Sequence, residues 1–134
     1  MTSRVRSLIE RLGPDRRSRG TSAEQLAERW LIEQGLTLVT RNYRCRMGEI
    51  DLIMRHRACL VFVEVRWRSG SGFGSASASV TRNKQQRLIR AARHYLARHP
   101  QAADLDCRFD VVGMAPGAAG RPDFEWIQHA FYAE

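Results

Sequence analysis

Two carboxylates of this sequence stand where a negative charge is costly. Asp51 lies within the segment EIDLIM and Glu64 within LVFVEV, and both segments are rich in residues that favour strands. A carboxylate inside an apolar strand raises the free energy of the folded state unless it is paired, hydrogen-bonded or bound to a metal ion. Two such groups side by side could share a divalent cation, and hard oxygen ligands suit Mg²⁺ or Mn²⁺.

The charge distribution makes these acids stand out. The chain has 134 residues and a formal net charge of +8, with 22 basic and 14 acidic residues. Between residues 37 and 100 there are 13 basic residues, and the only acids are Glu49, Asp51 and Glu64. Lys84 is the sole lysine of the chain. A surplus of this kind favours polyanionic partners, which means nucleic acid or an anionic membrane surface.

Asp51 and Glu64 can meet only in some strand registers. If Asp51 lies opposite Phe62 in an antiparallel hairpin, the alternation of side chains along each strand determines which residues share its face. That face then carries Glu49, Asp51, Glu64 and Arg66. The two carboxylates would be diagonal neighbours, roughly 7 Å apart. A slip of one residue would separate them onto opposite faces, and the sequence leaves both registers open.

The hydrophobic patterns predict one α/β domain with a mixed β-sheet flanked by helices. A basic N-terminal arm, residues 1–19, should precede a single domain at residues 20–134. The capping candidates Thr21 and Ser22 should open the first helix, with Glu24 as the reciprocal partner of Thr21. The predicted elements are a helix to residue 35, strands at 36–46, 49–55 and 59–68, a Gly/Ser-rich loop at 69–79, a helix at 81–99, and strands at 109–114 and 124–131.

Other patterns argue against several kinds of site. No segment has the roughly 18 consecutive apolar residues of a membrane span, and the Arg-rich start lacks the apolar stretch of a secretory signal. We therefore expect a cytoplasmic protein without a membrane partner. Cys45, Cys59 and Cys107 contain no C-x-x-C pair, so we expect reduced cysteines in packing roles. The four histidines show no spacing typical of metal ligands.

Several separated motifs resemble, in their order, the YraN family of small bacterial proteins. The resemblance covers residues 20–114. Its motifs are the segment 20–31 with Glu24 and Ala27, RNYR at 41–44, GEIDLI at 48–53, VFVEVR at 61–66, FG at 73–74, KQ at 84–85 with Arg87, and RFDVV at 108–112. The family is similar to the restriction-endonuclease-like, PD-(D/E)XK nuclease superfamily. The resemblance therefore implies a mixed β-sheet flanked by helices in the order α-β-β-β-α-β-β.

The resemblance also implies a phosphodiesterase site at the two carboxylates. Asp51 matches the first acid of the superfamily motif, and Glu64 matches the acid of its E-X-K half. Arg66 takes the place of the motif lysine. The implied ligands of Mg²⁺ or Mn²⁺ are Asp51, Glu64 and the main-chain carbonyl of Val65. Glu24 matches a helix acid that lies near the metal in related nucleases.

Arg66 departs from the motif, and two interpretations follow. An arginine stays protonated and cannot act as a base, although its planar fork binds phosphate well. The chain could have lost cleavage and kept binding, or Lys84 could compensate from the packed side of the second helix. Contacts with nucleic acid, DNA rather than RNA, are expected from Lys84, Gln85, Arg87 and Arg44.

Each of these residues also has a plainer interpretation. Glu24 could serve only the helix cap. Asp51 and Glu64 could form ordinary ion pairs, as Asp110 could with Arg108. The candidate partners of Asp51 and Glu64 are Arg44, Arg66 and Arg68.

The resulting function hypothesis is a metal-dependent endonuclease. Branched DNA, such as a Holliday junction, is the substrate suggested by the superfamily, and junction cleavage would require a homodimer because two symmetric cuts need two sites. One alternative is a catalytically silent DNA- or RNA-binding module that keeps the nuclease fold. Another is a protein-interaction scaffold whose arginine surplus has no polyanion to bind.

Overall fold

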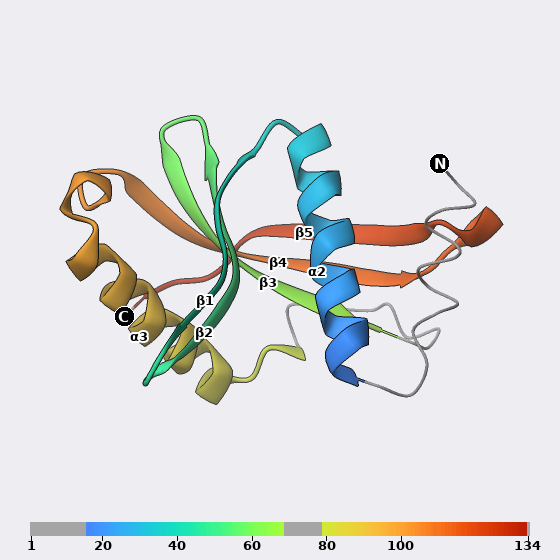
Figure 1. Cartoon of the computed structure of the whole chain (residues 1–134), viewed down its shortest axis with the longest axis horizontal. Helices are drawn as coiled ribbons and strands as arrows, with labels where there is room; N and C mark the ends of the chain where they lie inside the picture. The colour runs from blue at the N-terminus through green and yellow to red at the C-terminus, as the bar shows by residue number, and fades with distance from the viewer. Residues whose placement is uncertain (1–15, 69–78, 134) are drawn as a thin grey trace.

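The computed structural model describes residues 16–68 and 79–133 and has an α/β fold (Figure 1). Most of the predicted Gly/Ser-rich loop, residues 69–78, lies outside the described residues, as do residues 1–15 of the predicted arm. The element bounds are α2 (Arg16–Glu33), β1 (Thr37–Cys45), β2 (Gly48–His56), β3 (Cys59–Trp67), α3 (Arg82–Arg98), β4 (Asp106–Pro116) and β5 (Pro122–Phe131). The predicted order of two helices and five strands is confirmed.

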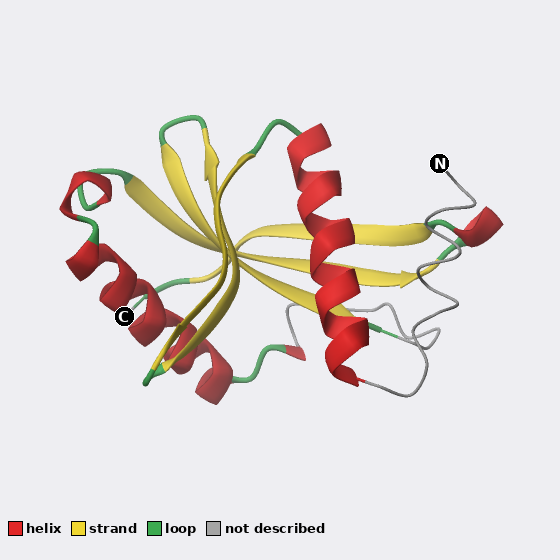
Figure 2. Ribbon diagram, viewed as in Figure 1, coloured by secondary structure: helices red, strands yellow, loops and turns green. Residues whose placement is uncertain are grey.

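The five strands form one mixed sheet in the order β1-β2-β3-β4-β5 (Figure 2). Neighbouring strands are antiparallel except β3 and β4, which are parallel. Short turns can join antiparallel neighbours, whereas a parallel pair requires a long crossover, and α3 lies in that crossover. The sheet therefore has the mixed, helix-flanked arrangement expected of a restriction-endonuclease-like fold.

Among the described residues, each face of the sheet carries one helix and one apolar core. The alternation of side chains along β3 separates the two cores, because Phe62 packs with the α3 side and Val61 and Val63 pack with the α2 side. Leu88 of α3 belongs to the first core and Leu31 of α2 to the second. The central strands are thus covered on both faces, which fixes the backbone that carries the candidate carboxylates.

Helix α3 begins and packs as predicted. Thr81 is its N-cap, and the threonine hydroxyl accepts a hydrogen bond from the backbone N–H of Lys84 at 3.2 Å. Its buried face consists of Leu88, Ile89, Ala91, Ala92 and Tyr95. Its exposed residues include Arg87, Arg90, Arg93 and Arg98. Neither α3 nor any other helix in the described ranges is long and apolar enough to cross a membrane.

Helix α2 begins earlier than predicted. It starts at Arg16, so Thr21 and Ser22 lie inside the helix and do not cap it. The interpretation of Glu24 as a capping partner is therefore wrong, because the free N–H groups lie only in the first turn. Arginine is a good helix former, which allows the helix to extend through residues 16–19 of the predicted arm. The capping-box pattern of the sequence therefore lies within the helix and not at its start.

Candidate active site

The two candidate carboxylates come from β2 and β3, where these strands stop pairing. The ladder ends with Leu52 opposite Val63, which makes Asp51 and Glu64 the next residues on the two strands. The observed register differs by two residues from the one with Asp51 opposite Phe62 that Sequence analysis considered, because the turn occupies residues 57–58. A shift of two leaves every side chain on its face, so the predicted convergence of the two acids is retained.

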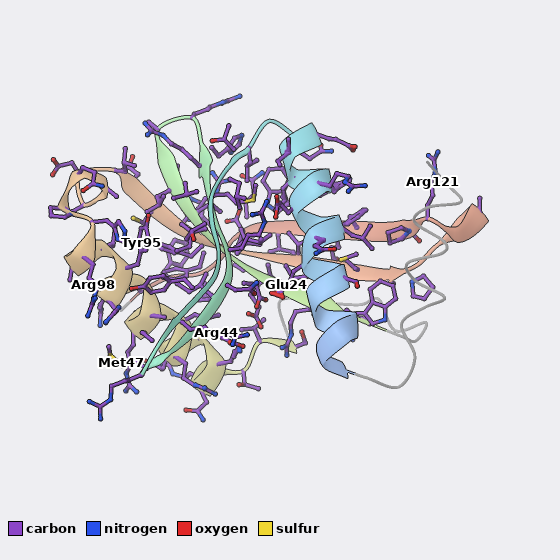
Figure 3. All side chains as sticks on the ribbon, viewed as in Figure 1. Glu24, Arg44, Met47, Tyr95, Arg98 and Arg121 are labelled. Carbon is purple, nitrogen blue, oxygen red and sulfur yellow. The ribbon has the colours of Figure 1, made fainter. Side chains whose placement is uncertain are left out.

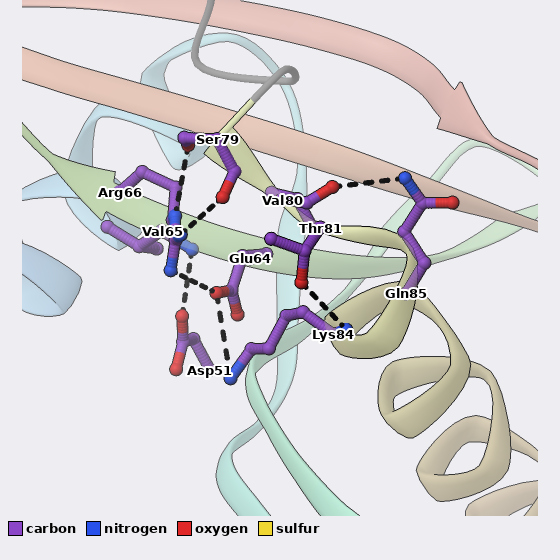
Figure 4. A network of polar contacts seen from close by, with 9 residues as sticks. All are labelled: Asp51, Glu64, Val65, Arg66, Ser79, Val80, Thr81, Lys84 and Gln85. Carbon is purple, nitrogen blue, oxygen red and sulfur yellow. Dashed lines mark hydrogen bonds and ion pairs between the residues drawn. The ribbon is translucent and has the colours of Figure 1, made fainter.

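The carboxylate of Asp51 occupies the gap that opens between the strands. Its Oδ2 accepts a hydrogen bond from the backbone N–H of Val65 at 2.8 Å (Figure 4). The paired stretch of β2 does not extend to this N–H group, so the carboxylate satisfies a donor that the ladder leaves open. The bond therefore holds Asp51 against β3.

Glu64 is the most buried of the candidate catalytic residues, with 4% of its surface exposed. Its Oε2 lies 3.2 Å from Nη1 of Arg66 and 3.8 Å from Nζ of Lys84. Of the ion pairs considered for Glu64, the one with Arg66 is confirmed. The lysine comes from the first turn of α3, and Figure 4 shows its side chain reaching toward Glu64 and Asp51. A strand and a helix thus each contribute one cation to this acid.

Glu24 reaches the same carboxylates from α2. Its side chain interacts with that of Asp51, which raises the pKa of Glu24, and Asp51 interacts in the same way with Glu64. Figure 3 shows Glu24 and Arg44 near the centre of the molecule, whereas Met47 marks the tip of the β1–β2 hairpin. Acids from α2, β2 and β3 are therefore linked in one chain of contacts.

Burial raises the pKa values of these three acids, and the charge of Asp51 raises those of Glu64 and Glu24 further. Burial raises the pKa of Glu64 to about 8, and the negative charge of Asp51 adds to the effect. The same two causes raise the pKa of Glu24 to about 8. Burial also raises the pKa of Asp51, while the Val65 N–H and the positive charge of Lys84 oppose that shift. A cation added here would relieve the repulsion and favour the ionised carboxylates.

The available donors fit a hard divalent cation. Over residues 16–68 and 79–133, no three His, Cys, Asp or Glu side chains form a metal-binding group by themselves. Mg²⁺ does not require such a group, because proteins often hold it with one or two carboxylates and leave the other positions to water and substrate phosphate. Asp51 and Glu64 are two such carboxylates, and the main chain of Val65 adjoins the first of them.

Arg66 anchors the strand to the segment that leads into α3. Its Nε donates to Oγ of Ser79 at 3.2 Å, its Nη2 to the Ser79 carbonyl at 2.6 Å, and its Nη1 to Glu64. A lysine has a single ammonium group and could not make all three contacts in this geometry. Sequence analysis missed Ser79, because a serine at the end of a Gly/Ser-rich segment has no distinguishing pattern.

The other residues predicted to touch nucleic acid occupy different positions. The side-chain amide of Gln85 donates to the carbonyl of Val80 at 3.1 Å, so it braces the start of α3. Arg87 is exposed on α3. Arg44 is exposed on β1 and lies 3.3 Å from Glu49, so this arginine pairs with neither of the two central acids. Gln85 and Arg44 therefore already have partners within the protein.

A second buried acid has its predicted partner. Asp110 is fully buried and accepts hydrogen bonds from Nε of Arg108 at 3.0 and 3.1 Å. Nε1 of Trp126 and the backbone N–H of His129 donate to the same carboxylate at 2.9 and 3.2 Å. Nη2 of Arg108 also contacts Nδ1 of His56 at 2.9 Å. This network is saturated with protein donors, which is typical of a structural role.

Known proteins share most of this chain. Residues 23–114 match a family described as uncharacterised protein family UPF0102. A UPF0102 protein of Alcanivorax borkumensis is 51% identical over 89% of this chain and 95% of its own. One from Aeromonas hydrophila is 52% identical over 98% of both chains. The chain belongs to the UPF0102 family.

UPF0102 is the YraN family, so this membership confirms the resemblance that Sequence analysis drew from the motifs. The matched segment includes every candidate site residue from Glu24 to Arg87, and it ends at Met114, before β5. Among solved structures, SfsA of Pyrococcus furiosus in complex with Ca²⁺ aligns over 85% of this chain and 64% of its own. Its TM-score is 0.38 and its identity 15%, a likeness too distant to inform the function of this UPF0102 chain.

Proposed function

We propose that this chain binds nucleic acid and hydrolyses phosphodiester bonds with the help of Mg²⁺ or Mn²⁺. The observation that carries the proposal is the linked pair Asp51 and Glu64 at the open end of a strand ladder, in a chain with a net charge of +8. Buried acids whose pKa values are raised by burial and by one another are typical of functional sites. The positive net charge favours a polyanionic substrate.

Two carboxylates and a main-chain carbonyl would hold the cation, which when bound polarises a phosphoryl oxygen, activates a water and orients an in-line attack. Those ligands are Asp51, Glu64 and Val65. The N–H of Val65 keeps the Asp51 carboxylate in place without an ion pair. Glu24, whose pKa is about 8, can hold or release a proton beside Asp51 near neutral pH.

Lys84 takes the role that the nuclease motif gives to lysine. Its ammonium group lies 3.8 Å from Glu64, on the side of α3, while Arg66 is engaged with Ser79. A compact ammonium charge beside the two acids can stabilise negative charge that develops on a phosphate. The cation that acts on the substrate therefore comes from a helix in this chain.

The proposed substrate is DNA rather than RNA. Branched DNA follows from analogy with the nuclease superfamily, which includes Holliday junction resolvases. Resolution of a junction by symmetric cuts needs two active sites, so the proposal includes a homodimer for that substrate.

A cleavage assay tests the proposal. Wild-type protein, Asp51→Asn and the control variant Glu49→Gln would be incubated with duplex, single-stranded, flap and four-way-junction DNA and with RNA, in Mg²⁺ or Mn²⁺. The control changes an exposed acid two residues away that pairs with Arg44. We expect cleavage by wild type and Glu49→Gln and none by Asp51→Asn. Equal cleavage by Asp51→Asn would contradict the proposal.

A catalytically silent binding module is the second candidate function. It is favoured by Arg66, which stands in place of the motif lysine and is held by Ser79 and Glu64. In that case neither wild type nor Arg66→Lys would cleave any substrate, although both would bind DNA with a strong dependence on salt.

A further inference from the structure

Within the part of the chain that the structure describes, three exposed arginines of α3 lack the acidic partners that other arginines have. Arg41 and Arg44 each pair with a glutamate. Helix α3 contains no acid, and within the described ranges Arg87, Arg90 and Arg98 pair with no carboxylate. Like charges three or four residues apart repel one another and destabilise a helix. An anion from another molecule would relieve this repulsion.

These cations lie on one continuous ridge of α3. The α3 ridge consists of Lys84, Arg87, Arg90, His94 and Arg98, which follow one another at spacings of three or four residues. From its first to its last residue it is roughly 21 Å long at 1.5 Å per residue. Along the axis of a duplex, that length corresponds to about six base pairs at 3.4 Å each. The ridge begins at Lys84, which already contacts Glu64 in the candidate active site.

The β1–β2 hairpin fixes the ridge in place. Nδ1 of His94 is hydrogen-bonded to the hydroxyl of Tyr43 on β1. Gly48 packs directly on the helix backbone, since a Cβ at this position would lie 2.9 Å from the carbonyl oxygen of Arg87. Arg46, in the adjoining turn, is also exposed. The helix backbone that carries these cations is therefore held against the hairpin.

The chemistry of the ridge suits a phosphate backbone better than a membrane surface. A helix that lies in a membrane interface needs an exposed apolar face. The apolar face of α3 is buried against the sheet. In the described ranges the exposed large apolar side chains are Ile32, Val39, Met47 and Tyr132, and none of them belongs to α3.

We propose that the α3 ridge binds the phosphate backbone of a nucleic-acid strand and leads it into the candidate active site. This inference rests on the proposed function and adds the surface that positions the substrate. Contacts from arginine to phosphate fix the register of a nucleic acid without reading its bases. The ridge should therefore bind different sequences with similar affinity.

A salt titration of binding with two matched triple variants tests the inference. The ridge variant is Arg87→Gln/Arg90→Gln/Arg98→Gln, and the control is Arg29→Gln/Arg55→Gln/Arg57→Gln, which removes three exposed arginines elsewhere. Both lose the same charge, and glutamine preserves helix propensity. Binding of a fluorescein-labelled duplex of about 20 base pairs, two helical turns, would be measured by anisotropy in EDTA, which prevents cleavage. Circular dichroism would verify the fold.

The slope of the logarithm of the association constant against the logarithm of the salt concentration is negative. Loss of three contacts from the ridge should make it shallower by about 2.7, while the control keeps the wild-type slope. An equal loss of slope in both variants would contradict the inference that the α3 ridge binds the phosphate backbone, but it would not contradict the proposed function. Absence of wild-type binding to duplex, single-stranded DNA and RNA would contradict the proposed function itself. Ridge-dependent binding to vesicles of equal parts phosphatidylglycerol and phosphatidylcholine, with no effect on DNA, would assign the ridge to a membrane instead.

Discussion

The molecule buries acids in two places, and the two places are built differently. Around Asp110, an arginine, an indole N–H and a backbone N–H all donate to one carboxylate. Around Asp51 and Glu64, acids contact other acids; burial raises both pKa values, and the charge of Asp51 raises that of Glu64 further. Burial alone therefore does not mark a functional acid. What distinguishes the candidate site is a local excess of negative charge that a metal ion and a phosphate could complete.

The largest expected difference between the two regions is in stability. Asp110→Asn should lower the free energy of unfolding by about 3 to 5 kcal/mol, because it leaves the buried charge of Arg108 without its partner. Asp51→Asn should change it by less than about 1 kcal/mol, since an amide oxygen can still accept the Val65 N–H and the repulsion between acids is reduced. Urea unfolding of both variants measures the two values. Equal destabilisation would mean that both acids are structural.

The two cations beside Glu64 should have separable roles. Lys84→Met should lower the cleavage rate about 100-fold, as expected for the loss of one group that stabilises the transition state. Arg66→Lys should not increase cleavage and should reduce stability, because it loses contacts to Ser79. Single-turnover kinetics measure the first effect and urea unfolding the second. An increase in cleavage by Arg66→Lys would instead identify Arg66 as the reason for weak activity.

The candidate site should make stability depend on pH. The pKa of Glu64 is raised from 4.5 to about 8 in the folded state, so the folded protein binds more protons than the unfolded chain between these values. Its contribution to stability is therefore fully present at and below pH 4.5 and is lost as the pH rises to about 8. Urea unfolding at several pH values checks this.

Two comparisons isolate the origin of that pH dependence. Glu64→Gln should show a smaller fall in stability with pH than the wild type, because the titrating group is gone. Saturating Mg²⁺ should also reduce the fall in the wild type, since the cation favours the ionised acids. An identical pH profile in wild type and Glu64→Gln would exclude this residue as the source.

The smallest effect is expected for an ion pair outside both regions. Arg41 and Glu28 form an ion pair whose arginine side chain is 58% exposed. Arg41→Ala should lower the free energy of unfolding by about 0 to 1 kcal/mol, because water and salt screen such pairs. A larger loss would show that ion-pair geometry, rather than burial, determines the energetics in this protein.

Much of the fold follows from local sequence patterns. The Thr81 cap, the buried stripe of α3 and the order of elements were all predictable, because caps and the 3.6-residue period act within a few residues. The start of α2 was not, since a capping-box pattern does not prevent good helix formers upstream from extending a helix. The hairpin register could not be fixed from the sequence. When a turn moves by one residue along the chain, each strand residue gains a partner two residues away from the former one, so a small uncertainty in the turn leaves the register open.

The sequence by itself identified Asp51 and Glu64 as acids within neighbouring apolar strands, but it left open whether they share a face, which the observed register decides. It also identified Lys84 as a cation on the packed side of α3. Only the tertiary structure decided that Glu24 joins Asp51, that Lys84 lies beside Glu64, and that Arg66 is also held by Ser79. These contacts join α2, β2, β3 and α3, and their geometry depends on where the strands separate and how each helix packs on the sheet, which no local period encodes.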